Sequence, residues 1–189
     1  MEVKYNLKYE KDDLYQSLDR TTTWIENCDT KTSVVISGIG IIAAIILSSD
    51  YITKIKSIIK YMIDNLSFWT AVFLLITAIA LVFCISGCYH LYRVLVPRVD
   101  TGLYKEKGLN SESLIYFLAI SKRKSFIDYK SELEKCSENN LINDIISQIY
   151  ICSKICSQKF DYYTRGLNLV VIGLISLGIM MIIGSIVAN

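Results

Sequence analysis

The apolar residues of this 189-residue chain gather in three long runs that contain no charged side chain. The runs cover residues 32–49, 66–89 and 166–189. An α-helix rises about 1.5 Å per residue, so about 20 residues cross the roughly 30 Å hydrocarbon core of a bilayer. The second and third runs are long enough to span, and the first is marginal. The pattern therefore predicts an all-α integral membrane protein with three transmembrane helices at these positions.

The segment between the first two runs, residues 50–65, carries an amphipathic helical pattern. Its isoleucines share one stripe of the helix, and its lysines lie away from the centre of that stripe. We expect a connector on the outer face of the membrane. It is either a short interfacial link or a segment that lies on the outer leaflet and rearranges to line a pore.

Residues 90–165 are polar, and we expect them to form a helical hairpin outside the bilayer. Pro97 should end any extension of the second span. The first helix of the hairpin is expected from Ser111 to Lys135, with these apolar side chains buried: Leu114, Phe117, Leu118, Phe126 and Leu133. The second begins near Leu141, and because no proline follows, one helix of about 49 residues should continue to the C-terminus. Residues 1–31 similarly predict a helix that leads directly into the first span.

The basic residues near the ends of the runs are distributed unequally between the two sides. One side holds Arg20, Lys31, Arg93, Arg98, Lys105, Lys107, Lys154, Lys159 and Arg165, and the other holds Lys54, Lys56 and Lys60. Cytoplasmic flanks carry the excess of Lys and Arg in membrane proteins. We therefore expect the N-terminus and residues 90–165 in the cytoplasm, and the C-terminus in the periplasm or outside the cell.

Composition agrees with a membrane protein and excludes several other classes. Hydrophobic residues make up 52% of the chain, the mean hydropathy is +0.39, and a net charge of +2 is too small to suggest a nucleic-acid partner. The six cysteines occur with a single histidine, His90, so no metal site or cofactor is expected. No Gly-x-Ser-x-Gly, P-loop or His-Glu-x-x-His motif is present, and we expect no enzymatic activity. The basic cluster Lys122 to Lys124 is more typical of a solvated helix face than of a phosphate site.

Several segments together resemble one known family. They are DTKTSVVISGIGIIAAII at the first span, LVPRV after the second, SESLIYFLAISK with DYKSEL, and DIISQIYICSKICSQKFDYYTRG before the third. In this order they resemble the membrane effector of Pycsar over roughly residues 20 to 185. The resemblance implies an antiphage effector of the bacterial inner membrane that works with a pyrimidine cyclase. In that family cyclic UMP or cyclic CMP made during phage infection activates the effector, which impairs the inner membrane and causes abortive infection.

If the chain binds such a nucleotide, the pocket must be made by helices. A cyclic phosphodiester carries one negative charge, best met by Arg or Lys, and a pyrimidine offers a flat face to an aromatic ring. Candidates gather near the predicted inner membrane surface: Trp24, Asn27, Lys31, Arg93, Arg98, Lys154, Lys159, Tyr162, Tyr163 and Arg165. The alternative is that these bases reflect topology and anionic lipid alone.

Asp29 has no such explanation, because an acid gains nothing from anionic lipid. We expect Asp29, Lys31 and Arg165 to form a gating or pairing group, with Lys159 as a further partner. Three spans cannot enclose a wide aqueous path, so a homo-oligomer is expected. Small residues that permit close helix approach are Ser33, Ser37, Gly40, Ala44, Gly184 and Ala188. Two alternatives stay open: a ligand-independent pore-forming or holin-like toxin, and a non-toxic membrane scaffold.

Overall fold

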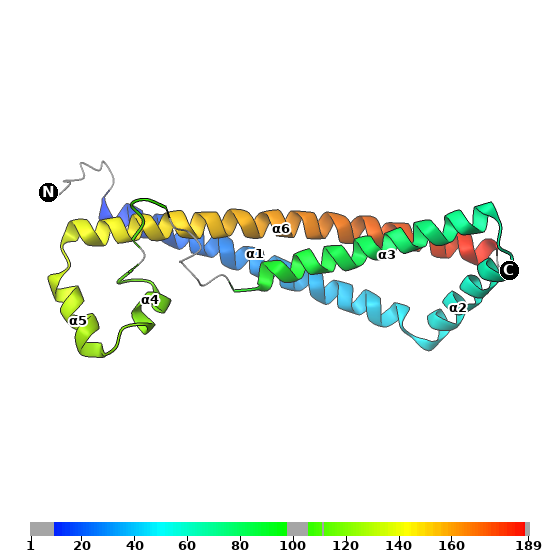
Figure 1. The fold of residues 1–189 in the computed structure, drawn as a ribbon, viewed down its shortest axis with the longest axis horizontal. Helices are drawn as coiled ribbons and strands as arrows, with labels where there is room; N and C mark the ends of the chain where they lie inside the picture. Colours follow the sequence, from blue (N-terminus) through cyan, green and yellow to red (C-terminus); the bar gives the residue numbers. More distant parts are fainter. Residues whose placement is uncertain (1–9, 98–105, 111, 188–189) are drawn as a thin grey trace. The chain divides into compact units, whose positions relative to one another are not determined.

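The computed structural model describes residues 10–97, 106–110 and 112–187. All the regular structure in these ranges is helical (Figure 1): α1 (Lys11–Ile46), α2 (Ser49–Asp64), α3 (Phe68–Leu95), α4 (Phe117–Ser121), α5 (Phe126–Lys135) and α6 (Glu138–Val187). The predicted all-α fold is confirmed. Four residues singled out in the sequence, Arg98, Lys105, Ser111 and Ala188, lie outside the described ranges.

The chain divides into two compact units. The membrane unit comprises Cys28–Val96 and Phe160–Asn189, and the polar unit comprises Met1–Asn27 and Pro97–Lys159. The division falls within α1 and within α6. The continuous C-terminal helix predicted from Leu141 is confirmed, since α6 has 50 residues without a break.

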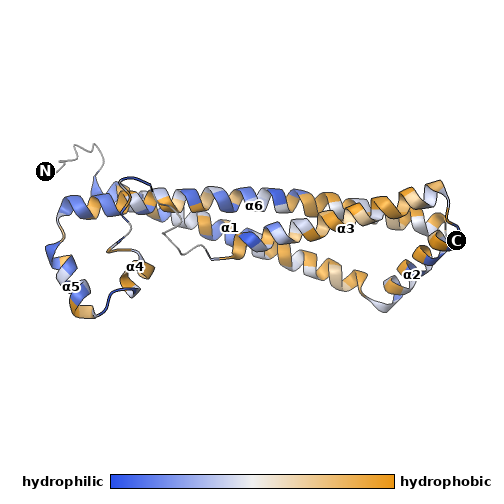
Figure 2. Ribbon diagram, viewed as in Figure 1, coloured by the Kyte–Doolittle hydropathy of each residue, from blue (hydrophilic) through white to orange (hydrophobic). Residues whose placement is uncertain are grey.

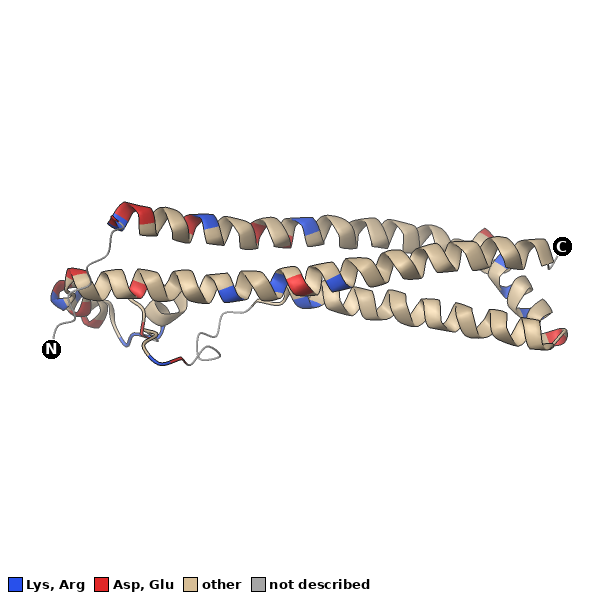
Figure 3. Cartoon of the chain, turned by 90° about the horizontal axis from the view of Figure 1, so that it is seen from above, with Lys and Arg blue, Asp and Glu red and all other residues tan. Residues whose placement is uncertain are grey.

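Three helices, α1, α3 and α6, are long and apolar enough to cross a membrane. Figure 2 shows apolar residues along α3 and the C-terminal half of α6, and Figure 3 shows that charged residues are almost absent there. Large apolar side chains are exposed on these helices, for example Phe68 at 76% and Trp69 at 79% of their surface. Such exposure is unfavourable in water and is expected for residues that face lipid tails.

Helices α3 and α6 pack antiparallel with their backbones in contact. A β-carbon on Gly87 would lie 2.6 Å from Cγ2 of Val170, and one on Gly166 would lie 2.9 Å from the backbone nitrogen of Leu91. Further along the same pair, a β-carbon on Gly173 would lie 2.9 Å from the backbone nitrogen of Cys84. Real β-carbons do not approach other atoms this closely, so only glycine permits this approach. Close backbone contact at small residues is how helices associate in a lipid environment.

The predicted amphipathic helix of residues 50–65 is α2. Ile58 and Met62 are buried on one face, and the three lysines of the helix are exposed. A capping box of Ser67 and Thr70 then starts α3, because the Ser67 hydroxyl accepts a hydrogen bond from the Thr70 backbone. Helix α3 ends at Leu95, before Pro97, as the sequence predicted.

The predicted helix from Ser111 to Lys135 is wrong. Helix α4 begins only at Phe117, and residues 122–125 separate it from α5. The Ser113 hydroxyl accepts hydrogen bonds from the backbone N–H groups of Ile115 and Tyr116, so this stretch satisfies its donors without a helix. The expected burial also fails at three positions, because 61% of Phe117, 76% of Phe126 and 42% of Leu133 is exposed.

Candidate functional site

In the membrane unit, the predicted residue Arg93 near the end of α3 contacts aromatic side chains. Its guanidinium carbon lies 5.4 Å from the centroid of the Tyr162 ring in α6, and its Nη1 donates to the Tyr89 hydroxyl at 3.5 Å. The His90 ring lies 5.7 Å from the same Tyr162 ring. A guanidinium over an aromatic face is attracted by the ring quadrupole. These contacts join the C-terminal end of α3 to α6 at Tyr162, just before the apolar part of α6.

The other predicted residues of the membrane unit differ in exposure. Asp29 and Tyr163 are half-buried, whereas Lys31 and Arg165 are exposed. Nearby, the Thr32 hydroxyl is fully buried and donates to the backbone carbonyl of Cys28 at 2.7 Å. The pairing of Asp29 and Lys31 with bases before the third span stays a prediction.

The remaining predicted residues belong to the polar unit. Trp24 and Asn27 are exposed on α1, while Lys159 is buried and only 5% exposed. The Lys154 Nζ lies 5.2 Å from the centroid of the Tyr150 ring, whose hydroxyl donates to the Glu106 carboxylate at 2.9 Å. The ten candidates that we singled out thus divide between the two units, apart from Arg98 outside the described residues.

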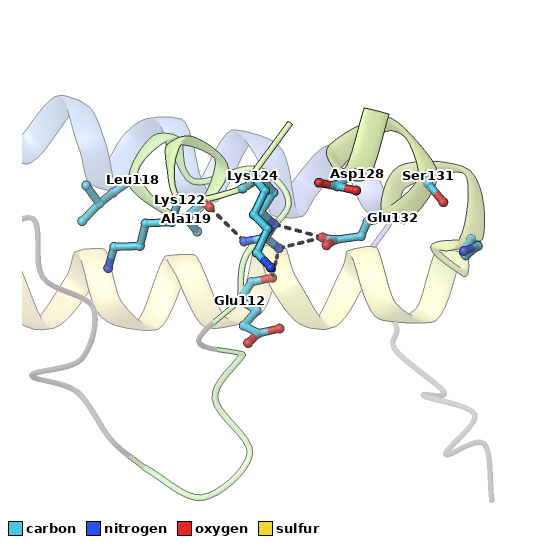
Figure 4. A pocket seen from close by; sticks show the side chains of 10 residues that line it. Glu112, Leu118, Ala119, Lys122, Lys124, Asp128, Ser131 and Glu132 are labelled. Atoms are coloured by element: carbon cyan, nitrogen blue, oxygen red, sulfur yellow. Dashed lines mark hydrogen bonds and ion pairs between the residues drawn. The ribbon is translucent and has the colours of Figure 1, made fainter. Parts of the chain in front are cut away.

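The polar unit contains a hollow of about 560 Å³ beside α4 and α5 (Figure 4). Arg123 lies in its wall and ties three segments together. Its Nη2 and Nε contact Glu132 Oε2 of α5 at 2.9 and 3.0 Å, and its Nη1 donates to the Ala119 carbonyl of α4 at 2.8 Å. A fourth bond joins Nη2 to the Glu112 carbonyl at 3.3 Å. Arg123 therefore acts mainly as a structural clamp.

Three lysines line the same hollow without forming an ion pair with any residue in the described ranges. They are Lys122, Lys124 and Lys135, and all three are exposed. The interpretation of Lys122 to Lys124 as a solvated face holds for the two lysines. It is wrong for Arg123, whose side chain is only 14% exposed.

A second hollow of about 590 Å³ shares Glu112, Arg123, Glu132 and Lys135 with the first. Residues of α6 also line it, among them Asp144, which is 1% exposed. Asp144 Oδ2 accepts hydrogen bonds from the Ser113 hydroxyl at 3.0 Å and the Leu114 backbone N–H at 2.8 Å. These two bonds hold the segment before α4 against α6.

Asp144 and Lys135 were not identified as site residues from the sequence, and Arg123 was assigned only to a solvated face. For Asp144 a signal was present, because this acid lies on the same helical face as the apolar Leu141 and Ile151. An acid on an otherwise apolar stripe is either paired or functional. Arg123 and Lys135 gave no such signal, since the packing of α4 and α5 alone brings them to one wall.

Comparison with known proteins gives a consistent result. A family model for the PycTM Pycsar effector protein domain matches residues 13–186. The Pycsar effector protein GmPycTM of Gulbenkiania mobilis is 35% identical to the chain over 166 residues, and the match covers 84% of each protein. No solved structure matches the chain.

Proposed function

Because the chain belongs to the PycTM family of Pycsar effector proteins, we propose that it is an antiphage effector activated by a cyclic pyrimidine nucleotide, cyclic UMP or cyclic CMP. The observation that carries this proposal is the extent of the family match. Residues 13–186 include both the helices of the polar unit and the three apolar helices. The matched region therefore includes residues of both units. In this proposal the polar unit receives the signal and the membrane unit responds to it.

The response is loss of inner-membrane integrity, which stops the host cell before phage replicate. The polar unit lies in the cytoplasm in this proposal, where a pyrimidine cyclase supplies the nucleotide, and the C-terminus lies outside. The distribution of basic residues supports this orientation.

Permeabilisation requires an oligomer in this proposal. Gly40 on α1 has no atom of the described residues within 4 Å of the position of a β-carbon, so the described part of the chain leaves this position uncovered. Gly184 is different, because a β-carbon there would lie 2.7 Å from Ile58 of the same chain. Gly40 therefore supports contact between copies, whereas Gly184 packs within one copy.

The proposal is tested by producing the chain in cells with an active or a catalytically dead pyrimidine cyclase. Uptake of a membrane-impermeant dye and loss of membrane potential should require both the chain and the active cyclase. Dye uptake with the dead cyclase would instead identify a ligand-independent toxin. Intact membranes with the active cyclase, at normal abundance of the chain, would favour a non-toxic scaffold.

A further inference from the structure

The Asp144 carboxylate has one oxygen that is not used within the polar unit. Oδ2 binds Ser113 and Leu114, but Oδ1 is buried and has no hydrogen-bond partner among the described residues. Leaving a buried polar atom without a partner costs about 1–3 kcal/mol, and more for a charged group. Folded proteins rarely retain such an atom unless it has a role. Asp144 also lines the second hollow, so the oxygen without a partner belongs to a side chain of this pocket.

A pyrimidine base supplies the donor that this oxygen lacks. A carboxylate only accepts hydrogen bonds, and uracil presents its N3–H and cytosine its N4 amino group. Leu109 and Leu114 line the same hollow and offer apolar contact to a flat ring. The volume of about 590 Å³ lies within the range of pockets that hold small ligands.

A lysine in the lining of the hollow suits the anionic end of the same molecule. Lys135 lines both hollows, and Lys122 and Lys124 lie in the adjoining one. These lysines form no ion pair with the described residues and can contact a phosphate, whereas Arg123 is engaged by Glu132. The hollow therefore contains one exposed lysine, Lys135, the Arg123–Glu132 ion pair and the exposed Glu112, together with the Asp144 carboxylate, whose Oδ1 has no hydrogen-bond partner among the described residues. A cyclic nucleotide has the matching polarity, with an anionic phosphate and a base that donates.

We propose that this hollow, between Lys135 of α5 and Asp144 of α6, binds the cyclic pyrimidine nucleotide, with the phosphate at Lys135 and the base edge at Asp144 Oδ1. The inference rests on the proposed function for the identity of the ligand. The proposed site lies in the polar unit and not at the boundary residues predicted from the sequence, such as Lys31. Because Asp144 belongs to α6, the base bonds directly to the helix that continues as the third span.

The test measures binding of cyclic UMP and cyclic CMP to the purified full chain in detergent by isothermal titration calorimetry. Asp144→Asn keeps an oxygen for Ser113 and Leu114 but replaces the free acceptor by an amide donor. It should weaken binding of whichever nucleotide the parent binds by about tenfold or more. Lys135→Ala should also weaken binding and should reduce its dependence on salt. The matched control is Lys130→Ala on the same helix, which removes an exposed base outside both hollows and should bind like the parent.

The outcomes separate the site from the function. If the parent binds neither nucleotide, the proposed function falls, and the site with it. If the parent binds but Asp144→Asn and Lys135→Ala retain its affinity while Lys31→Ala loses it, the site is overturned and the function stands. Circular dichroism and size-exclusion chromatography check folding. Because Lys135 is exposed, Lys135→Ala should fold normally. If Asp144→Asn fails to fold, binding by Lys135→Ala alone tests the site.

Discussion

The backbone nitrogen of Val170 in α6 lies 2.7 Å from the position that a β-carbon on Gly87 of α3 would occupy. A side chain cannot be accommodated there by a rotamer change, because the obstacle is backbone. The same relationship recurs at Gly166 with Leu91 and at Gly173 with Cys84, so one continuous line of contact joins the two helices. The antiparallel pair is the packing core of the membrane unit.

Gly87→Ala should therefore destabilise the protein. Alanine favours a helix over glycine by roughly 0.5–1 kcal/mol, but the clash with Val170 forces the helices apart at a cost of roughly 1–3 kcal/mol. The matched control is Gly178→Ala on α6, because no atom lies within 4 Å of a β-carbon there. Thermal unfolding in detergent should show a lower midpoint for Gly87→Ala and an unchanged or higher midpoint for Gly178→Ala. Equal midpoints would show that the close approach is absent in the folded protein.

Arg123→Lys should loosen the polar unit in the absence of ligand. Lysine cannot contact Glu132, Ala119 and Glu112 together, because it lacks the planar fork of the guanidinium. Glu132 is 48% exposed, so the loss is moderate, roughly 1 kcal/mol or more. Hydrogen exchange of the backbone amides of α4 and α5 should accelerate by several-fold. Lys130→Ala breaks only the exposed ion pair with Glu134 at 3.8 Å and should leave this exchange unchanged. Unaltered exchange in Arg123→Lys would contradict the clamp.

The long helices were predictable because their signals are local. Runs without charge set the three apolar helices, and Pro97 accounts for the end of α3 before it. The break before α4 was not predictable, because it depends on Asp144, which takes the N–H of Leu114 from 30 positions away along the chain. Helix propensity near Ser113 contains no information about that partner.

The same distinction holds for the candidate site. Basic and aromatic residues beside the spans could be identified, and one pair among them, Arg93 and Tyr162, is in contact. The sequence shows where glycines occur but not that Gly87 of α3 and Gly166 of α6 face each other. It also gives no means of knowing that Arg123 and Lys135 share a wall with Asp144. Contacts between separate elements are set by tertiary packing, which no local pattern specifies.

Cys136 provides a test of orientation. In a chain with Cys136 as its single cysteine, a membrane-impermeant maleimide should leave intact spheroplasts unlabelled and should label them after permeabilisation, because the proposed orientation places the polar unit in the cytoplasm. Labelling of intact cells would contradict the proposed orientation.

Cys152 is a poorer probe, since burial and then the neighbouring Cys156 raise the pKa of its thiol. Less of the Cys152 thiol is therefore ionised at neutral pH. The rate of its reaction with maleimide should still increase with pH above about 8.5, the usual pKa of a thiol.

Asp29 and Lys31 precede the first span, and their charges should control the resting state of the membrane unit. Asp29 is half-buried, and an acid in that position beside lipid is costly unless a base neutralises it. Arg165, at the polar flank of the third span, is the partner that we predict. Asp29→Ala should therefore change the resting state, giving either dye uptake without a cyclase or no response with one. Lys31→Ala should insert normally but show a weaker response to the active cyclase.

The measurement is dye uptake at equal membrane abundance of the variants, with the dead cyclase as reference. The charge reversal Asp29→Arg with Arg165→Asp should restore the resting state if the two side chains pair. Parent-like behaviour of both single variants would instead mean that these charges only orient the first span.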